Sequence, residues 1–133
     1  MPTDGYAQYQ QNQLLTASPA KLLLAAYEGA IKFAHIASQK MKEGDLAEQS
    51  KYINKTVAIV AELLSTLRED IDPVLVGRLK SLYTYVIEKL ARANLQQDQA
   101  ALAEAIRILS QLQEAWVEAE RILREDSLRE NAA

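Results

Sequence analysis

Apolar residues recur at three- and four-residue intervals through most of the chain, which is the spacing of amphipathic α-helices. The first such stretch begins after Ser18 and Pro19, a pair typical of a helix N-cap followed by proline at the first helical position. It ends at Gly44, because glycine just past a helix adopts the left-handed conformation without strain. The pattern therefore predicts a helix over 19–43.

This first predicted helix carries two apolar stripes. The stripe expected to face the core consists of Leu23, Tyr27, Ala30, Ile31, Ala34, Ala37 and Met41. The second stripe, on an adjacent face, consists of Leu22, Ala26, Gly29, Phe33 and Ile36. Together the stripes are wider than the roughly 100° that a surface helix buries, so we expect the second stripe to form a shallow groove for another apolar segment. Alternatively, Phe33 and Ile36 pack on a second neighbouring helix of the same bundle.

Three further helices are predicted, each beginning after an acidic N-cap residue, at Asp45, Asp72 and Asp98. Their predicted ranges are 46–69, 73–94 and 99–124. Because the connections are short, neighbouring helices must run antiparallel. The sequence thus predicts an all-α fold, an antiparallel up-down-up-down four-helix bundle over 18–124.

The apolar positions of these three helices predict which side chains face the core. In the second helix they are Leu46, Ile53, Val57, Val60, Leu64 and Leu67, with Tyr52, Ile59 and Leu63 extending the apolar face to one side. In the third they are Leu75, Val76, Leu79, Leu82, Tyr83, Val86, Ile87 and Leu90. In the fourth they are Leu102, Ala105, Ile106, Leu109, Leu112, Trp116, Val117 and Leu123.

Both ends of the chain lack apolar periodicity. Residues 1–17 are polar and glutamine-rich, yet they carry Tyr6, Tyr9, Leu14 and Leu15. We expect them to form a mobile N-terminal arm whose aromatic side chains can lie on the bundle, with a frayed tail as the alternative. Residues 125–133 are charged and are predicted to be a polar, frayed C-terminal tail.

Composition excludes several function classes. The 133 residues are 49% hydrophobic, enough for the core of one domain. The formal net charge of -3 without a basic stripe argues against nucleic-acid binding. No apolar run approaches the ~20 residues of a membrane span, and no signal peptide is predicted. The absence of cysteine fits a reducing compartment, so a cytoplasmic protein without membrane insertion is expected.

The sequence offers little for metal or catalytic chemistry. A di-iron site in a bundle needs Glu-x-x-His motifs, but Lys32 stands three residues before the one histidine, His35. Zinc would find no cysteine and this single histidine. No cofactor, metal site or catalytic residue is therefore predicted, and the chain is not expected to be an enzyme.

Two alternatives of other classes remain open. A lone histidine on the polar face of a helical bundle is the arrangement of histidine phosphotransfer domains. Those domains usually carry lysine and glycine three and four residues after the histidine, whereas His35 is followed there by Ser38 and Gln39. The other alternative is a structural bundle that buries its wide apolar arc in a homo-oligomer.

The assembled residues resemble a known family. The similar motifs are Gly5-Tyr6-x-x-Tyr9-Gln10, Leu15-Thr16-Ala17-Ser18-Pro19 and Leu22-Leu23-Leu24-x-x-Tyr27-Glu28-Gly29-Ala30-Ile31-x-Phe33. Over residues 5–120 the chain resembles the flagellar secretion chaperones of the FliS type, including Trp116 near the end of the fourth helix. The pair Ala25-Ala26 departs from the bulkier residues often found there.

The resemblance implies a cytosolic export chaperone for flagellin. Members of the family bind the disordered C-terminal region of flagellin, prevent its premature polymerisation and keep it competent for type III export. The N-terminal arm can cover an apolar surface that the client protein takes over, and contact with the flagellar export gate is also implied. The expected partner-binding residues are Tyr6, Tyr9, Leu15, Leu22, Ala26, Gly29, Phe33 and Ile36.

Overall fold

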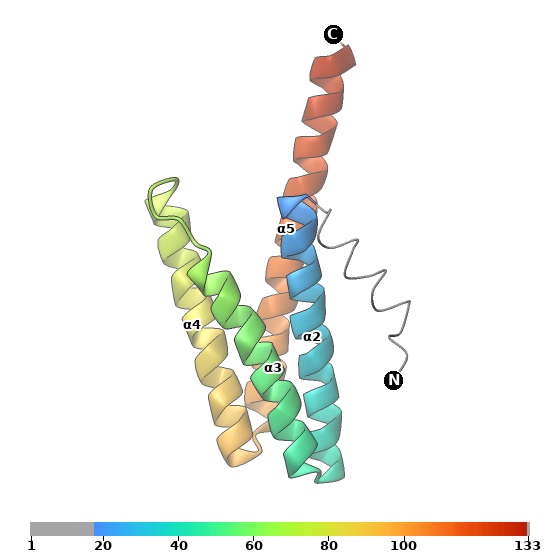
Figure 1. Ribbon diagram of the computed structural model, residues 1–133, viewed down its shortest axis with the longest axis vertical. Helices are drawn as coiled ribbons and strands as arrows, with labels where there is room; N and C mark the ends of the chain where they lie inside the picture. Colours follow the sequence, from blue (N-terminus) through green and yellow to red (C-terminus); the bar gives the residue numbers. More distant parts are fainter. Residues whose placement is uncertain (1–17, 133) are drawn as a thin grey trace, which may run out of the picture.

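A computed structural model of the chain describes residues 18–132, and this range is built from four α-helices (Figure 1). The helices are α2 (Pro19–Glu43), α3 (Leu46–Ser65), α4 (Pro73–Gln96) and α5 (Gln99–Ala132). Helix α2 packs against α3 and α5, and α4 packs against the same two helices. Short connections make each helix antiparallel to the next, so the predicted all-α, up-down-up-down four-helix bundle is confirmed.

The two ends of the bundle differ (Figure 1). At one end, which we call the closed end, the α2–α3 and α4–α5 connections lie close together. At the other, the open end, the pair α3 and α4 diverges from the pair α2 and α5, and the last turns of α5 continue beyond the first turn of α2. The open end therefore has less of its apolar surface covered by neighbouring helices.

Local capping explains where the helices begin. The Ser18 hydroxyl accepts a hydrogen bond from the backbone N–H of Lys21, 3.3 Å away, and Pro19 follows at the first position. The carboxylates of Asp45, Asp72 and Asp98 cap the next three helices in the same way, at 3.0–3.1 Å. Each such cap is worth about 1 kcal/mol. All four predicted helix starts are found in the structure.

The helix ends differ more from the predicted ranges. Helix α3 stops at Ser65, four residues before 69, where the Thr66 hydroxyl hydrogen-bonds to the Leu63 carbonyl oxygen and replaces a further helical bond. Helix α5 instead continues to Ala132, eight residues past 124. Arg121 forms ion pairs with Glu118 and Glu125 one turn away on either side, and such pairs support a helix without apolar contacts. Residues 121–132 are exposed throughout.

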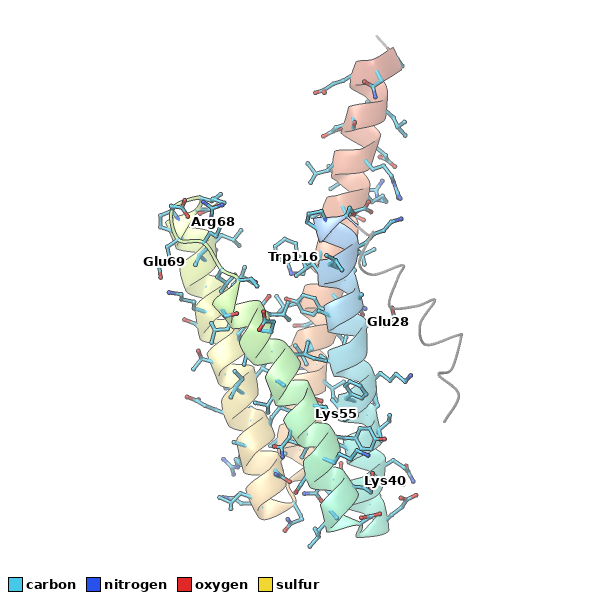
Figure 2. All side chains as sticks on the ribbon, viewed as in Figure 1. Glu28, Lys40, Lys55, Arg68, Glu69 and Trp116 are labelled. Atoms are coloured by element: carbon cyan, nitrogen blue, oxygen red, sulfur yellow. The ribbon has the colours of Figure 1, made fainter. Side chains whose placement is uncertain are left out.

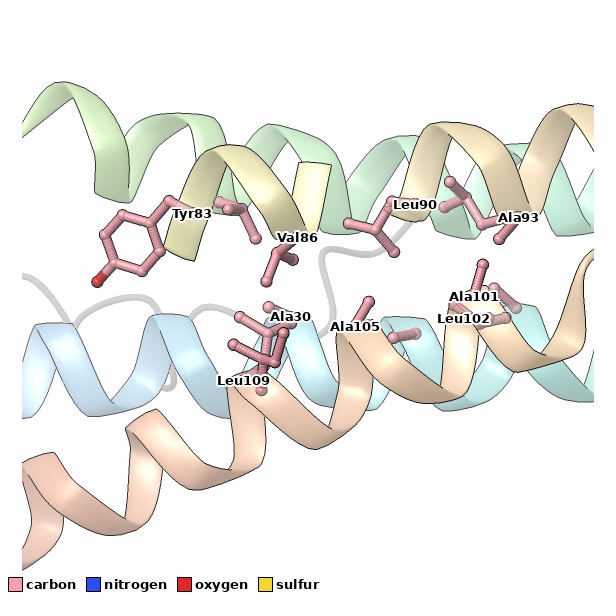
Figure 3. Packing of buried hydrophobic residues seen from close by; sticks show 14 of the residues in the cluster. Ala30, Tyr83, Val86, Leu90, Ala93, Ala101, Leu102, Ala105 and Leu109 are labelled. Carbon is pink, nitrogen blue, oxygen red and sulfur yellow. The ribbon is translucent and has the colours of Figure 1, made fainter. Parts of the chain in front are cut away.

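The core lies where the four helices meet. The predicted core stripe of α2 is confirmed: five of its members are buried, and Leu23 and Ile31 pack partly buried against them. Figure 3 shows alanines of α2, α4 and α5 facing larger side chains such as Leu90 and Leu109. Small residues opposite large ones let the helices approach closely without leaving cavities.

Several predicted core positions are exposed instead. Leu46 is 55% exposed and Leu123 is 69% exposed, and Leu75 and Val117 are also exposed. These residues lie at helix ends or where α5 leaves the bundle, so no neighbouring helix covers them. Polar side chains are buried further inside, such as Thr56, whose hydroxyl donates to the Tyr52 carbonyl oxygen at 3.0 Å.

Within residues 18–132 no helix is both long and apolar enough to cross a membrane.

Candidate binding groove

An apolar hollow of about 700 Å³ lies between the beginning of α2 and the end of α3, at the open end of the bundle. We call it the α2–α3 groove. Its lining residues are Pro19, Leu22, Leu23, Ala26, Ile59, Glu62, Leu63 and Thr66. Glu62 is the one ionisable side chain among them, so the surface offered to a ligand is almost entirely apolar.

The groove is a consequence of a small residue on α2 and of the divergence of α3 from α2 toward the open end. Ala26 stands where a larger side chain of α2 would fill the space toward α3, which makes a shallow floor. Leu22, one turn earlier, is 44% exposed, because α3 diverges from α2 toward this end (Figure 1). Bringing a large apolar side chain such as leucine fully out of water contributes about 1.5–3 kcal/mol, so these walls can bind an apolar segment.

The second stripe predicted on α2 divides between two environments. Leu22 and Ala26 line the groove, whereas Phe33 and Ile36 do not. Gly29 lies between these two parts, where a side-chain carbon added to it would meet Ile59 at 3.6 Å. Phe33 is partly covered by Tyr52 of α3, with ring centroids 5.8 Å apart and an angle of 38° between the rings. Phe33 therefore packs on a neighbouring helix, as the alternative interpretation of the second stripe predicted.

Two lysines of α3 accompany this aromatic pair. The Nζ atom of Lys55 lies 5.1 Å from the centre of the Phe33 ring and 5.4 Å from that of Tyr52. The Nζ atom of Lys51 lies 5.5 Å from the Tyr52 ring. Figure 2 labels Lys55 beside α3, where α3 runs along α2. Cation–π attraction holds these ammonium groups over the rings, so positive charge gathers on this part of the α2–α3 boundary.

Behind the groove, a buried hydrogen-bonded cluster joins three helices. The hydroxyl groups of Tyr27 (α2) and Tyr83 (α4) are hydrogen-bonded to each other, and the indole N–H of Trp116 (α5) donates to the Tyr27 hydroxyl oxygen at 3.1 Å. Burial is the main cause that raises the pKa of Tyr27 above its ordinary value, and it also raises the pKa of Tyr83. In Figure 2, Trp116 lies on the side of α5 that faces α3 and α4. The cluster links α2, α4 and α5 near the open end.

The other candidate residues have different positions. Tyr6, Tyr9 and Leu15 lie outside the described residues. His35 is exposed on α2. Among residues 18–132 no three histidine or acidic side chains gather as metal ligands.

The groove also contains residues that the site prediction did not include. Ile59 and Leu63 of α3 form the wall opposite Leu22 and Ala26, together with Glu62 and Thr66. The sequence contained a signal for two of these residues, because Ile59 and Leu63 belong to the apolar face that extends to one side of the second predicted helix. Periodicity placed them on that face, but only the antiparallel pairing of α2 with α3 places them opposite Leu22.

The fold and the groove define a class: an all-α, antiparallel helical bundle with an open apolar groove between two helices, a kind of surface on which amphipathic helices can lie. Comparison with known proteins identifies the family within this class. The family model described as "Flagellar protein FliS" matches residues 2–122. The chain therefore belongs to the FliS family of flagellar secretion chaperones, as its resemblance predicted.

Individual relatives agree with this family. The chain is 32% identical to "Flagellar secretion chaperone FliS" of Bacillus subtilis (strain 168), over 91% of this chain and 90% of the relative. It is 34% identical to the protein with the same name from Campylobacter jejuni, over 85% of this chain and 88% of the relative. The protein of that name from Salmonella typhimurium is 29% identical, with 84% of each chain covered.

Proposed function

We propose that this chain is a cytoplasmic export chaperone that binds the disordered C-terminal region of flagellin, its client. Binding prevents premature polymerisation and keeps the client competent for type III export. The observation that carries the proposal is the open α2–α3 groove, in which Leu22 stays exposed beside the small side chain of Ala26. Membership in a chaperone family supports binding rather than catalysis as the function.

The groove suits an unfolded client for an energetic reason. A disordered segment loses conformational freedom when it binds, and extended apolar contact must offset that cost. The groove offers leucine and isoleucine side chains from two helices, and a client helix can place a row of apolar residues against them. A few large client side chains, each contributing about 1.5–3 kcal/mol, then suffice for binding.

The N-terminal arm belongs to the same proposal. Pro19 lines the groove, and the arm precedes Ser18 and Pro19 in the sequence. Tyr6, Tyr9 and Leu15 are proposed to contact the groove or the client there. Gly29, Phe33 and Ile36 are proposed to extend the client contact along α2. Contact with the flagellar export gate is proposed as well, without assignment to particular residues.

The test is complex formation with flagellin, followed by size-exclusion chromatography with light scattering. Full-length flagellin should form a one-to-one complex, and flagellin without its C-terminal region should form none. Leu22→Asp places a charge on the groove wall and should lower the affinity at least tenfold. The matched control is Leu95→Asp, because Leu95 is 80% exposed at the closed end.

Circular dichroism of both variants establishes that the helices are retained. A second assay follows flagellin polymerisation by light scattering, which an equimolar amount of the chaperone should suppress. If flagellin lacking its C-terminal region binds as well as the full-length protein, or if Leu22→Asp binds normally, the proposed client site is wrong.

A further inference from the structure

The boundary between α2 and α3 carries opposite charges at two places. Glu62 lies on the wall of the α2–α3 groove, near the open end. Lys55 lies seven residues earlier on α3, with Lys51 one turn beyond it toward the closed end. At 1.5 Å per helical residue, about 10 Å separates Glu62 from Lys55 along α3.

These charges are available to a ligand. Among residues 18–132, neither Lys55 nor Glu62 forms an ion pair. Lys51 has only a long contact of 3.9 Å with Glu48. The Lys55 ammonium lies over Phe33 and Tyr52, which orders it beside the boundary without neutralising it. A ligand along this boundary therefore meets negative charge at the groove and positive charge about two helical turns away.

We propose that this pair of charges determines the direction in which a client helix binds. The groove takes the apolar side chains of an amphipathic helix, Glu62 binds a basic side chain beside them, and Lys55 with Lys51 binds acidic side chains about two turns along. This inference rests on the proposed function and adds the chemistry of the client: an apolar face with basic residues at one end and acidic residues at the other. Charges at the edge of an apolar contact select orientation more than they add affinity.

The probe is a synthetic helix of about 18 residues, long enough to span both charged places. It carries leucines at helical spacing, three glutamates at one end and three lysines at the other. Because the chain has no cysteine, a nitroxide can be attached to a single introduced cysteine in the full chain. The label sites are Asn54→Cys, next to Lys55, and Ser65→Cys, near Glu62, both exposed on α3.

In NMR spectra of the bound peptide, the label at Asn54→Cys should broaden the amide signals of the glutamate end. The label at Ser65→Cys should broaden the amide signals of the lysine end. The exchange Lys55→Glu with Glu62→Lys conserves net charge and leaves Lys51 in place, so it should abolish or reverse this assignment. The control exchange Glu88→Lys with Lys89→Glu on α4 should leave it unchanged. In the unlabelled chain, replacing all peptide charges by glutamine should weaken binding about three- to fivefold at low salt, with the difference lost near 1 M salt.

Three results would overturn the inference. The peptide does not bind, each label broadens both ends of the peptide equally, or the assignment is unchanged after the charge exchange. Circular dichroism checks whether the exchanged variant keeps its helices, and the salt dependence tests the role of the charges without any substitution in the chain. The proposed function fails separately, if flagellin forms no complex. Flagellin that binds unaffected by the exchange leaves the chaperone function standing and removes only the directional role of these charges.

Discussion

Replacing Tyr27 by phenylalanine removes one oxygen atom from a fully buried position and keeps the ring that packs in the core. The Tyr27 hydroxyl is bonded to the Tyr83 hydroxyl and accepts the indole N–H of Trp116. Tyr83 is 1% exposed, so its hydroxyl cannot turn to water instead. Trp116 is only partly buried, so its N–H can be hydrated at a smaller cost.

Leaving a buried polar group without a partner costs about 1–3 kcal/mol. For Tyr27→Phe we therefore expect the free energy of unfolding to fall by about 2 kcal/mol. In a domain of this size, that loss lowers Tm by roughly 6–10 °C. Thermal unfolding followed by circular dichroism and urea unfolding both measure the loss. Trp116 is the one tryptophan of the chain, so its fluorescence reports on the cluster directly.

The double variant Tyr27→Phe with Tyr83→Phe sharpens the test. With both hydroxyls removed, no phenol is left unpaired, so the double variant should lose less stability than the sum of the two single variants. Tyr85→Phe is the control, since this ring is exposed on α4 and should change stability by less than about 0.5 kcal/mol. Strict additivity, or a Tyr27→Phe variant as stable as the original chain, would refute the role assigned to the cluster.

Three further predictions concern pH, a helix end and the groove. Burial raises the folded-state pKa of Tyr27 above the ordinary value of 10.0. The contribution of Tyr27 to stability is therefore complete below pH 10 and is lost as pH rises further. Urea unfolding between about pH 8 and 11.5 should show this loss, and Tyr27→Phe should reduce it. Gly44→Ala should cost about 1 kcal/mol in urea unfolding, because Gly44 has a φ of 76° at the end of α2; a neutral effect would contradict the capping role. Ala26→Phe should fill the groove and weaken flagellin binding at least tenfold in calorimetry without lowering Tm, and undiminished binding would place the client elsewhere.

Features that depend on neighbours in sequence were predictable from the sequence. The four helix starts follow from side chains that cap the backbone three residues later, as at Ser18 and Asp72. The core stripe of α2, centred on Tyr27 and Ala34, follows from helical periodicity alone. The motifs between Gly5 and Phe33 suggested the family. Each of these needs only a short stretch of chain.

The positions of the apolar residues outside that stripe depended on the tertiary structure. Leu46 and Leu123 follow the same periodicity as buried residues but lie where no other helix reaches them. Phe33 and Leu22 share a stripe, yet Phe33 is partly covered by Tyr52 while Leu22 lines an open groove. Periodicity assigns a side chain to a helix face, and only the lengths and divergence of the neighbouring helices determine whether that face is covered.

The sequence by itself determined where the helices begin, their antiparallel order and the family, because local capping, short connections and sequence motifs are sufficient for these. Only the tertiary structure brought Ile59 and Leu63 opposite Ala26, and only it joined Tyr27 to Tyr83 and Trp116 across three helices. These contacts link residues far apart in the chain. They depend on how the helices diverge toward the open end, which is a property of the packed bundle and not of any one segment.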